Sequence, residues 1–183
     1  MKKVTLLGDS IRQIGYGLKV PELLGEGYEV FQPNDNCRFA KYTLRMLFDY
    51  REQIAGSDVI HWNNGLWDIC SKLFDDGEPF TSEEEYVYTM LRVARELKKL
   101  GKRVIFATTT PVHKEHIYND NEIIVRYNEI IVPKLQEMGI EINDLHSAVK
   151  EDVYKYICDD HIHLSEAGIE LCSKMVVKAI KAE

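Results

Sequence analysis

The sequence predicts one α/β domain in which helices cover both faces of a five-stranded parallel sheet. Two observations support this prediction: the chain has 183 residues, and short apolar segments alternate along it with longer amphipathic ones. A chain of this length buries a substantial core in a single domain. Alternating strands and helices are typical of a three-layer α/β/α architecture with right-handed crossovers. We therefore expect one domain over residues 1–183, with the flavodoxin-like strand order 2-1-3-4-5.

The predicted strands are short apolar segments, and the predicted helices are longer segments in which apolar residues recur with the helical period. The strands are expected at residues 4–7, 28–31, 58–62, 103–108 and 140–145. The helical stripes are Val87, Met90, Leu91, Ala94, Leu97 and Leu100, then Ile124, Tyr127, Ile131, Leu135 and Met138, then Ile169, Cys172, Met175, Val176 and Ala179. Gly101 and Gly139 follow the first two stripes as expected C-caps, and Pro133 is expected to kink the second helix.

Composition and charge narrow the functional classes. The formal net charge is −7, which argues against nucleic acid or an anionic membrane surface as a partner. The four cysteines are far apart and form no Cys-x-x-Cys motif, as expected for thiols in a reducing compartment. No apolar run approaches the roughly 20 residues that span a bilayer, and the segment before Asp9 is too short for a signal peptide. We expect a cytoplasmic protein.

A polar or glycine-containing segment follows each predicted strand. These segments are residues 8–10, 34–38, 63–65, 109–111 and 160–163. In open α/β sheets, ligand sites form beyond the carboxyl ends of the strands. We therefore expect these segments, which are far apart in the sequence, to converge on one edge of the sheet.

Two of these segments contain the side chains of a serine hydrolase. Gly8-Asp9-Ser10 places a hydroxyl on a tight turn after the first strand, and Asp160-His161-Ile162-His163 places a carboxylate and an imidazole near the other end of the chain. In such enzymes the imidazole takes the serine proton and the carboxylate orients the imidazole. The interval between the acid and the histidine selects Asp160 with His163, because the residue at the same interval before His161 is a cysteine.

Other interpretations of the same residues stay open at this point. Asp9 or Ser10 can serve only as the N-cap of the following helix. Residues 159–163 also contain side chains that bind metals, but the sequence shows no second cluster of ligands. His113 and His116 fit solvated positions in a loop. We expect neither a metal nor a cofactor.

The two motifs, Gly8-Asp9-Ser10 and Asp160-x-x-His163, resemble those of the GDSL/SGNH hydrolase family. This resemblance implies an esterase with a triad of Ser10, His163 and Asp160. It also implies an oxyanion hole with three donors: the serine N–H, a glycine N–H after the second strand, and an asparagine side chain after the third.

The chain departs from the family pattern at this oxyanion hole. Residues 36–41 resemble the family's Asn-x-Gly-x-x-Gly segment, with Lys41 at the position of the donating glycine, where its N–H can still donate. Gly65-Leu66-Trp67-Asp68 is in register with the family's Gly-x-Asn-Asp but has Trp67 at the asparagine position. We expect Asn63 or Asn64, with Asn63 favoured, to supply the amide instead. The alternatives are the indole of Trp67, or an Asn-Asn-Gly sequence that only forms a turn.

The sequence thus predicts a serine esterase that forms an acyl-enzyme. Asp9, Arg38 and Trp67 are expected to contact the substrate, with a surface ion pair as the alternative for Arg38, and Trp62 is expected in the core. Because the chain has little material for a lid, the expected substrate is a small ester, such as an O-acetyl group on a carbohydrate. Two alternatives remain: a flavodoxin-like module in which Asp9 accepts a phosphoryl group, and a carbohydrate-binding relative without hydrolytic activity.

Overall fold

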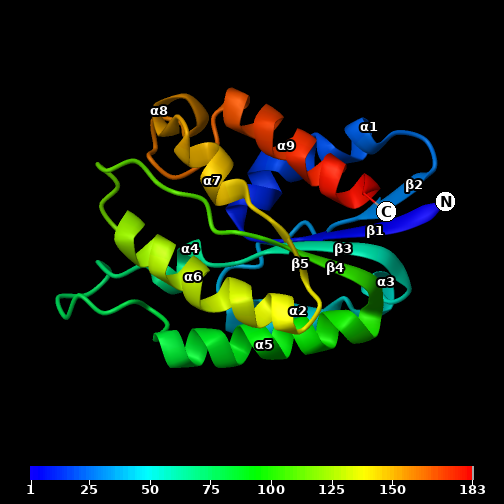
Figure 1. The fold of residues 1–183 in the computed structure, drawn as a ribbon, viewed down its shortest axis with the longest axis horizontal. Helices are drawn as coiled ribbons and strands as arrows, with labels where there is room; N and C mark the ends of the chain where they lie inside the picture. The colour runs from blue at the N-terminus through cyan, green and yellow to red at the C-terminus, as the bar shows by residue number, and fades with distance from the viewer. Residues whose placement is uncertain (183) are drawn as a thin grey trace.

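The computed structural model describes residues 1–182 and contains one parallel sheet between two layers of helices (Figure 1). The strand order is β2-β1-β3-β4-β5, which confirms the predicted order and fold class. The strands are β1 (Lys2–Leu7), β2 (Tyr28–Phe31), β3 (Ser57–Asn63), β4 (Gly101–Ala107) and β5 (Glu141–Asn143). Every neighbouring pair is parallel. The carboxyl ends of the strands therefore lie at the same edge of the sheet.

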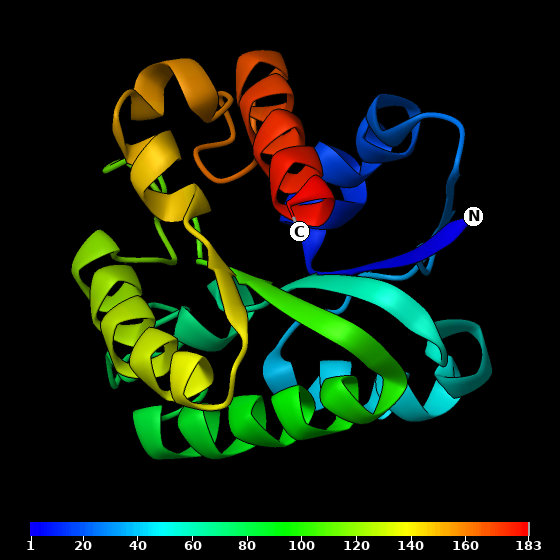
Figure 2. The ribbon, with the colours of Figure 1, turned by 45° about the vertical axis from the view of Figure 1, so that its right-hand side comes forward.

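Helices α1 and α9 cover one face of the sheet, and α2, α5 and α6 cover the other (Figure 2). On the first side of the sheet are η1 (Ile11–Gly15), η2 (Tyr16–Leu18), α1 (Val20–Leu24), α7 (Leu145–Lys150), α8 (Val153–Tyr156) and α9 (Glu166–Lys181). The remaining helices are α2 (Ala40–Asp49), α3 (Arg51–Ile54), α4 (Leu66–Ile69), α5 (Glu83–Leu100) and α6 (Asn121–Glu137). The three predicted apolar stripes form the buried faces of α5, α6 and α9.

The predicted helix ends are only partly correct. Gly139 adopts the left-handed conformation expected of a C-cap, with a φ of 74°. Gly101 also follows a helix, but its φ of −134° is extended and it begins β4. A Cβ atom at Gly101 would lie 2.7 Å from Ile60 Cδ1, so close packing on β3 explains the glycine there. Helix α6 continues through Pro133.

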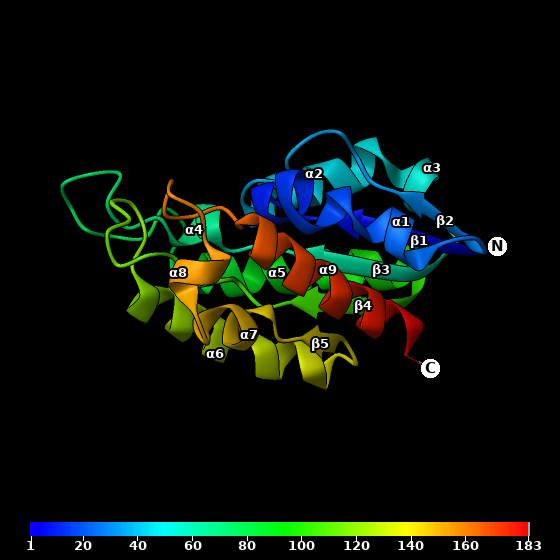
Figure 3. The same ribbon diagram turned by 90° about the horizontal axis from the view of Figure 1, so that it is seen from above.

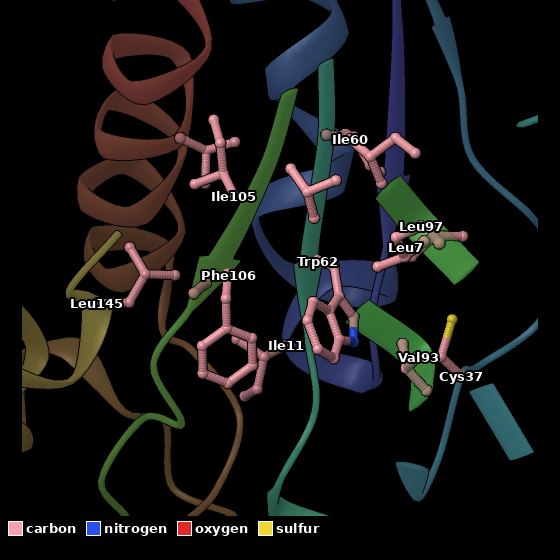
Figure 4. Packing of buried hydrophobic residues seen from close by; sticks show 14 of the residues in the cluster. Leu7, Ile11, Cys37, Ile60, Trp62, Val93, Leu97, Ile105, Phe106 and Leu145 are labelled. Carbon is pink, nitrogen blue, oxygen red and sulfur yellow. The ribbon is translucent and has the colours of Figure 1, made fainter. Parts of the chain in front are cut away.

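The core is centred on β3 and β4, where large side chains meet across the sheet (Figure 4). Trp62 is fully buried, as predicted, and its ring lies 4.9 Å from that of Phe106, centroid to centroid. The two residues are paired in the parallel register of β3 and β4. Figure 4 also shows Val93 and Leu97 of α5 on the side of the strands that bears Trp62. Apolar packing thus fixes the central strands. These strands in turn position the polar segments that follow them.

The chain termini lie far from the edge at which the predicted site segments gather. In Figure 3 both termini are at one end of the molecule, and the irregular segments before α5 and α6 project from the opposite end. Among the helices of residues 1–182, none is both long enough and apolar enough to cross a lipid bilayer.

The start of α9 holds the loop that carries Asp160 and His163. The Ser165 hydroxyl caps α9 by accepting from the Gly168 N–H at 3.1 Å, and the Ser165 N–H donates to the Tyr156 carbonyl at 2.9 Å. Ile157 and Leu164 form an antiparallel bridge that closes the loop. A Cβ at Gly168 would lie 2.1 Å from the Tyr156 carbonyl oxygen. Helix α9 can therefore approach this loop only because residue 168 is a glycine.

We predict that Gly168→Ala lowers the free energy of unfolding by about 1–3 kcal/mol, the usual cost of overpacking a well-packed site. Urea unfolding of the purified variant measures this change. Helix propensity alone predicts the opposite sign, since alanine is favoured over glycine inside a helix by up to about 1 kcal/mol. A variant that is more stable than wild type would contradict the packing described above.

Candidate active site

Ser10, His163 and Asp160 form a continuous hydrogen-bonded relay at the carboxyl edge of the sheet. Ser10 follows β1 and precedes the π-helix η1, and its side chain makes no capping hydrogen bond to that helix. His163 Nε2 lies 2.9 Å from Ser10 Oγ, and His163 Nδ1 lies 2.6 Å from Asp160 Oδ2. The structure therefore brings together the three side chains that sequence spacing selected from opposite ends of the chain.

Asp160 is held in place by its own loop. Its Oδ1 atom accepts hydrogen bonds from the Ile162 N–H at 3.0 Å and the His163 N–H at 2.9 Å. Partial burial would by itself raise the pKa of Asp160, but the hydrogen bonds from the His163 N–H, the Cys158 thiol and the Ile162 N–H hold this pKa well below its ordinary value. Asp160 is therefore ionised at neutral pH and can orient the imidazole and stabilise its protonated form.

The other histidine of the loop, His161, contacts a different part of the protein. His161 has a φ of 73°, which is uncommon for a residue other than glycine and reverses the chain locally. Its ring stacks on that of His113, with 5.1 Å between centroids and 15° between planes. His163 is thus the imidazole that reaches Ser10. No group of three or more His, Cys, Asp or Glu side chains within residues 1–182 is arranged to hold a metal ion.

Asp9 lies inside the protein, a position that does not favour the expected contact with substrate. Only 1% of the residue is exposed. Its Oδ1 atom accepts from the Ile11 N–H at 2.9 Å and from Asn63 Nδ2 at 2.8 Å. Burial raises the pKa of Asp9, which these two hydrogen bonds partly offset. The side chain therefore caps the turn after β1, and its burial favours neither the substrate-binding nor the phosphate-accepting role considered for it.

Asn63 belongs to a buried chain of polar groups beneath this turn. Its Oδ1 atom accepts from the Tyr16 hydroxyl at 2.7 Å, and the same hydroxyl lies 3.4 Å from His61 Nδ1. On the far side of the ring, His61 Nε2 lies 3.1 Å from Asn143 Nδ2, an amide donor. Burial lowers the pKa of His61 to about 3, so the ring is neutral. With Nε2 accepting, the proton is on Nδ1 and can be donated to Tyr16.

The buried chain also explains Gly8. A Cβ atom built on Gly8 would lie 2.0 Å from Asn63 Oδ1 and 2.8 Å from Arg12 Cβ. Gly8 does not have a positive φ within the described chain. The first residue of the Gly-Asp-Ser motif is therefore required by the close approach of the Asn63 amide rather than by the shape of the turn.

The Asn64 side chain is also hydrogen-bonded within the protein. Its Nδ2 atom donates to the Arg38 carbonyl at 2.8 Å, and its Oδ1 atom accepts from Trp62 Nε1 at 2.6 Å and Thr43 Oγ1 at 2.9 Å. Both asparagine side chains thus donate within the protein interior and neither lines the pocket beside Ser10. The structure therefore does not favour Asn63 or Asn64 as the amide donor to the oxyanion, because both side chains are hydrogen-bonded within the protein and neither lines the pocket.

The other candidates from the sequence lie around the start of α2. Lys41 is the second residue of α2, and its exposed ammonium group lies 3.9 Å from Glu85 Oε1. The expectation concerned the Lys41 N–H, which stays a prediction. Arg38 is exposed, and its guanidinium lies over the Tyr42 ring, 4.7 Å from the centroid, outside the residues that line the Ser10 pocket. The predicted contact of Arg38 with substrate is therefore not supported.

Asp68 joins α4 to the start of α2, a role that sequence reasoning missed. The fully buried carboxylate accepts from the Ala40 N–H at 2.9 Å, which satisfies one of the free N–H groups at the start of α2. Burial raises the pKa of Asp68 to about 7. The preceding residue, Trp67, lines the pocket beside Ser10. Leu66 and Trp67 of α4, rather than Asn63 or Asn64, therefore face the site.

A pocket of about 510 Å³ opens beside Ser10 and His163. Most of its lining side chains are apolar or aromatic, and several come from two irregular segments, residues 70–82 and 108–120. These segments are the loops that project in Figures 1 and 3. Two long loops thus border the pocket of a chain in which we expected little material for a lid.

Comparisons with known proteins agree with the motifs. No model of a known protein family matches the chain. It is similar to a GDSL esterase/lipase of Arabidopsis thaliana, with 29% identity over 118 residues that cover 56% of this chain and 46% of that protein. The chain therefore spans less than half of that relative.

Solved structures share the fold. An acetylxylan esterase from Geobacillus stearothermophilus has a TM-score of 0.76 and 20% identity, covering 100% of this chain and 95% of that one. A lipase/acylhydrolase from Enterococcus faecalis has a TM-score of 0.78 and 19% identity, covering 99% and 96%. These likenesses confirm the fold, and together with the sequence match they confirm the resemblance to GDSL/SGNH hydrolases.

We predict that Asn63→Ala destabilises the protein by about 1–3 kcal/mol, because it removes one hydrogen bond each from the buried Asp9 carboxylate and the buried Tyr16 hydroxyl. Urea unfolding measures the loss, and Asn34→Ala, on an exposed loop, is the control that we expect to leave stability unchanged. Wild-type stability combined with a large loss of esterase activity would show that the amide serves the reaction after all.

Proposed function

We propose that this protein is a serine hydrolase that cleaves carboxylic esters through an acyl-enzyme. The observation that carries the proposal is the relay from Ser10 Oγ to His163 Nε2, at 2.9 Å, and from His163 Nδ1 to Asp160, at 2.6 Å. A nucleophile, a base in contact with it, and a third group that orients the base are the parts such catalysis requires. The similarity to a GDSL esterase/lipase supports the same conclusion.

The reaction follows from these positions. Ser10 Oγ attacks the carbonyl carbon of the ester while His163 Nε2 takes the hydroxyl proton, and Asp160 stabilises the imidazolium that forms. The tetrahedral intermediate collapses when the alcohol leaves with the proton from His163. Water then attacks the acyl-enzyme and gives a proton to His163, and the second tetrahedral intermediate releases the acid as His163 returns that proton to Ser10 Oγ.

The oxyanion donors in this proposal are backbone groups after β1 and in the first turn of α2. They are the N–H of Ser10 and the N–H of Lys41, which lies in the first turn of α2, where amide groups have no partner within the helix. The indole N–H of Trp67 is the third candidate donor, because Trp67 faces the pocket at the position where the family motif has asparagine. Each such donor is worth roughly 10²–10³ in kcat.

The substrate in this proposal is a small-molecule carboxylic ester. Acetylxylan esterases share the fold, so an O-acetyl group on a carbohydrate is the first substrate class to consider. A binding module without activity is the alternative from a different class. It does not account for a serine hydroxyl that faces an imidazole instead of capping its own helix.

We predict that wild-type protein reacts covalently with a fluorophosphonate probe at Ser10 and hydrolyses p-nitrophenyl acetate. Ser10→Ala should lose the label and lower kcat by about 10⁴-fold or more, as for loss of a triad nucleophile. Intact-protein mass spectrometry and initial rates measure the two effects. An unlabelled wild-type protein, or a variant within tenfold of wild-type activity, would refute the assignment of the nucleophile.

We predict that His163→Ala loses activity by several orders of magnitude, whereas His161→Ala keeps most of it. His163 contacts both Ser10 and Asp160, while His161 stacks on His113. Because the two positions share one loop, each variant controls for damage to that loop. The reverse ranking of kcat/KM would mean that the base has been misidentified.

A further inference from the structure

We propose that the apolar pocket beside Ser10 binds the acyl group of the ester, and that the enzyme prefers medium-length alkanoyl esters to acetyl esters. This inference rests on the proposed esterase function and deepens it. It departs from the acetyl specificity suggested by the names of the structural neighbours, because the pocket of this chain has both the size and the chemistry for a longer chain.

The size of the pocket exceeds what an acetyl group requires. Its volume of about 510 Å³ lies within the range of roughly 300–1,000 Å³ that is typical of small-molecule sites. It begins at the two reacting side chains, Ser10 and His163, and extends along α4 to the loop of residues 70–82. An alkyl chain on the carbonyl carbon that Ser10 attacks can therefore extend directly into this pocket.

Apolar side chains gather at this pocket and remain open to solvent. Trp67, Leu73, Phe80 and Tyr118 all line it and are between 43% and 47% exposed. Large apolar side chains gathered at an opening mark a site for an apolar ligand. In a chain with a net charge of −7, this cluster of apolar side chains is well suited to an uncharged alkyl group.

The side-chain amide in the wall is not available to a sugar. Asn119 lines the pocket, but its amide donates to the Leu66 carbonyl at 2.9 Å and its oxygen lies 3.0 Å from His116 Nε2. Most of the other lining side chains are apolar or aromatic. A carbohydrate needs several donors and acceptors, because a buried hydroxyl without a partner is costly, so this lining favours an alkyl chain.

The position of the apolar wall favours the acyl group over the alcohol. Leu66 and Trp67 belong to α4 and Phe39 precedes α2, the elements that carry the proposed oxyanion donors. The alcohol must leave toward His163, because His163 gives it a proton. His163 is held in position by the loop before α9. The wall made by α4 and residues 70–82 is thus assigned to the other substituent of the carbonyl carbon.

The loops that form the wall are joined to each other. The Ser71 N–H donates to the Tyr118 carbonyl at 3.1 Å, and the Phe80 N–H donates to the Cys70 carbonyl at 2.8 Å. These bonds bring residues 70–82 and 108–120 together beside the site. The pocket is therefore already formed before a ligand arrives, which reduces the entropy lost on binding.

The test compares p-nitrophenyl octanoate with p-nitrophenyl acetate, each below the concentration at which the longer ester aggregates. Full burial of one methylene strengthens binding about fourfold. We therefore expect kcat/KM to be at least about tenfold higher for octanoate, even when the chain is only partly buried. A parallel series, methyl acetate and hexyl acetate, varies the alcohol instead, and we expect it to show no comparable rise.

A pair of variants locates the effect. Leu73→Asp places a charge on the proposed acyl wall and should lower the octanoate-to-acetate ratio of kcat/KM at least about fivefold. Phe48→Asp is the matched control, since Phe48 is 72% exposed on α2 and does not line the pocket. We expect it to keep the wild-type ratio. An unchanged ratio in Leu73→Asp would overturn the assignment of the wall.

The outcomes separate this inference from the proposed function. Hydrolysis of both esters with acetate preferred, or a preference that follows the alcohol series alone, would overturn the acyl assignment while the esterase stands. Failure to hydrolyse any ester, with no fluorophosphonate label on Ser10, would overturn both. A strong preference for octanoate that Leu73→Asp removes and Phe48→Asp retains would support the proposed acyl pocket.

Discussion

The arrangement of the site depends on one buried hydrogen bond, from the Asn63 amide at the end of β3 to the Asp9 carboxylate after β1. A carboxylate that is almost fully buried requires such partners, because an unpaired polar group inside a protein is costly. Tyr16, His61 and Asn143 extend the interaction from β1 across β3 to β5. The turn that presents Ser10 is therefore held by groups from β3, β5 and η2 rather than by its own short sequence.

The partner of Ser10 reaches it by a different route. Asp160 and His163 lie on a loop closed by the Ile157–Leu164 bridge and seated on the first turn of α9. Within the loop, backbone N–H groups bind one oxygen of Asp160 and leave the other for the imidazole. The turn that carries Ser10 and the loop that carries His163 are thus stabilised separately. The sheet and α9 set the distance between these two side chains.

The sequence was sufficient for the features that depend on periodicity and spacing. The strand order, the three long helices and the association of Ser10, His163 and Asp160 are of this kind. The sequence was not sufficient to choose between Asn63 and Trp67 as the oxyanion donor, because that choice depends on what covers each face of β3. Asn63 does share a face with His61, as alternation along a strand predicts, but Tyr16 covers that face and engages the amide. The pocket was missed because irregular segments without periodicity form its wall.

The contact between Gly8 and Asn63 has a consequence for how this sequence can change over evolution. The space that a side chain at position 8 would need is filled by Asn63 Oδ1, 2.0 Å from the ideal Cβ. Descendants of this chain that keep asparagine at position 63 are expected to keep glycine at position 8. A smaller residue at position 63 would relieve this contact and remove one partner of Asp9, but Arg12 Cβ, 2.8 Å from the same ideal Cβ, would still oppose a side chain. A library that randomises the turn after β1 is therefore expected to recover glycine at position 8.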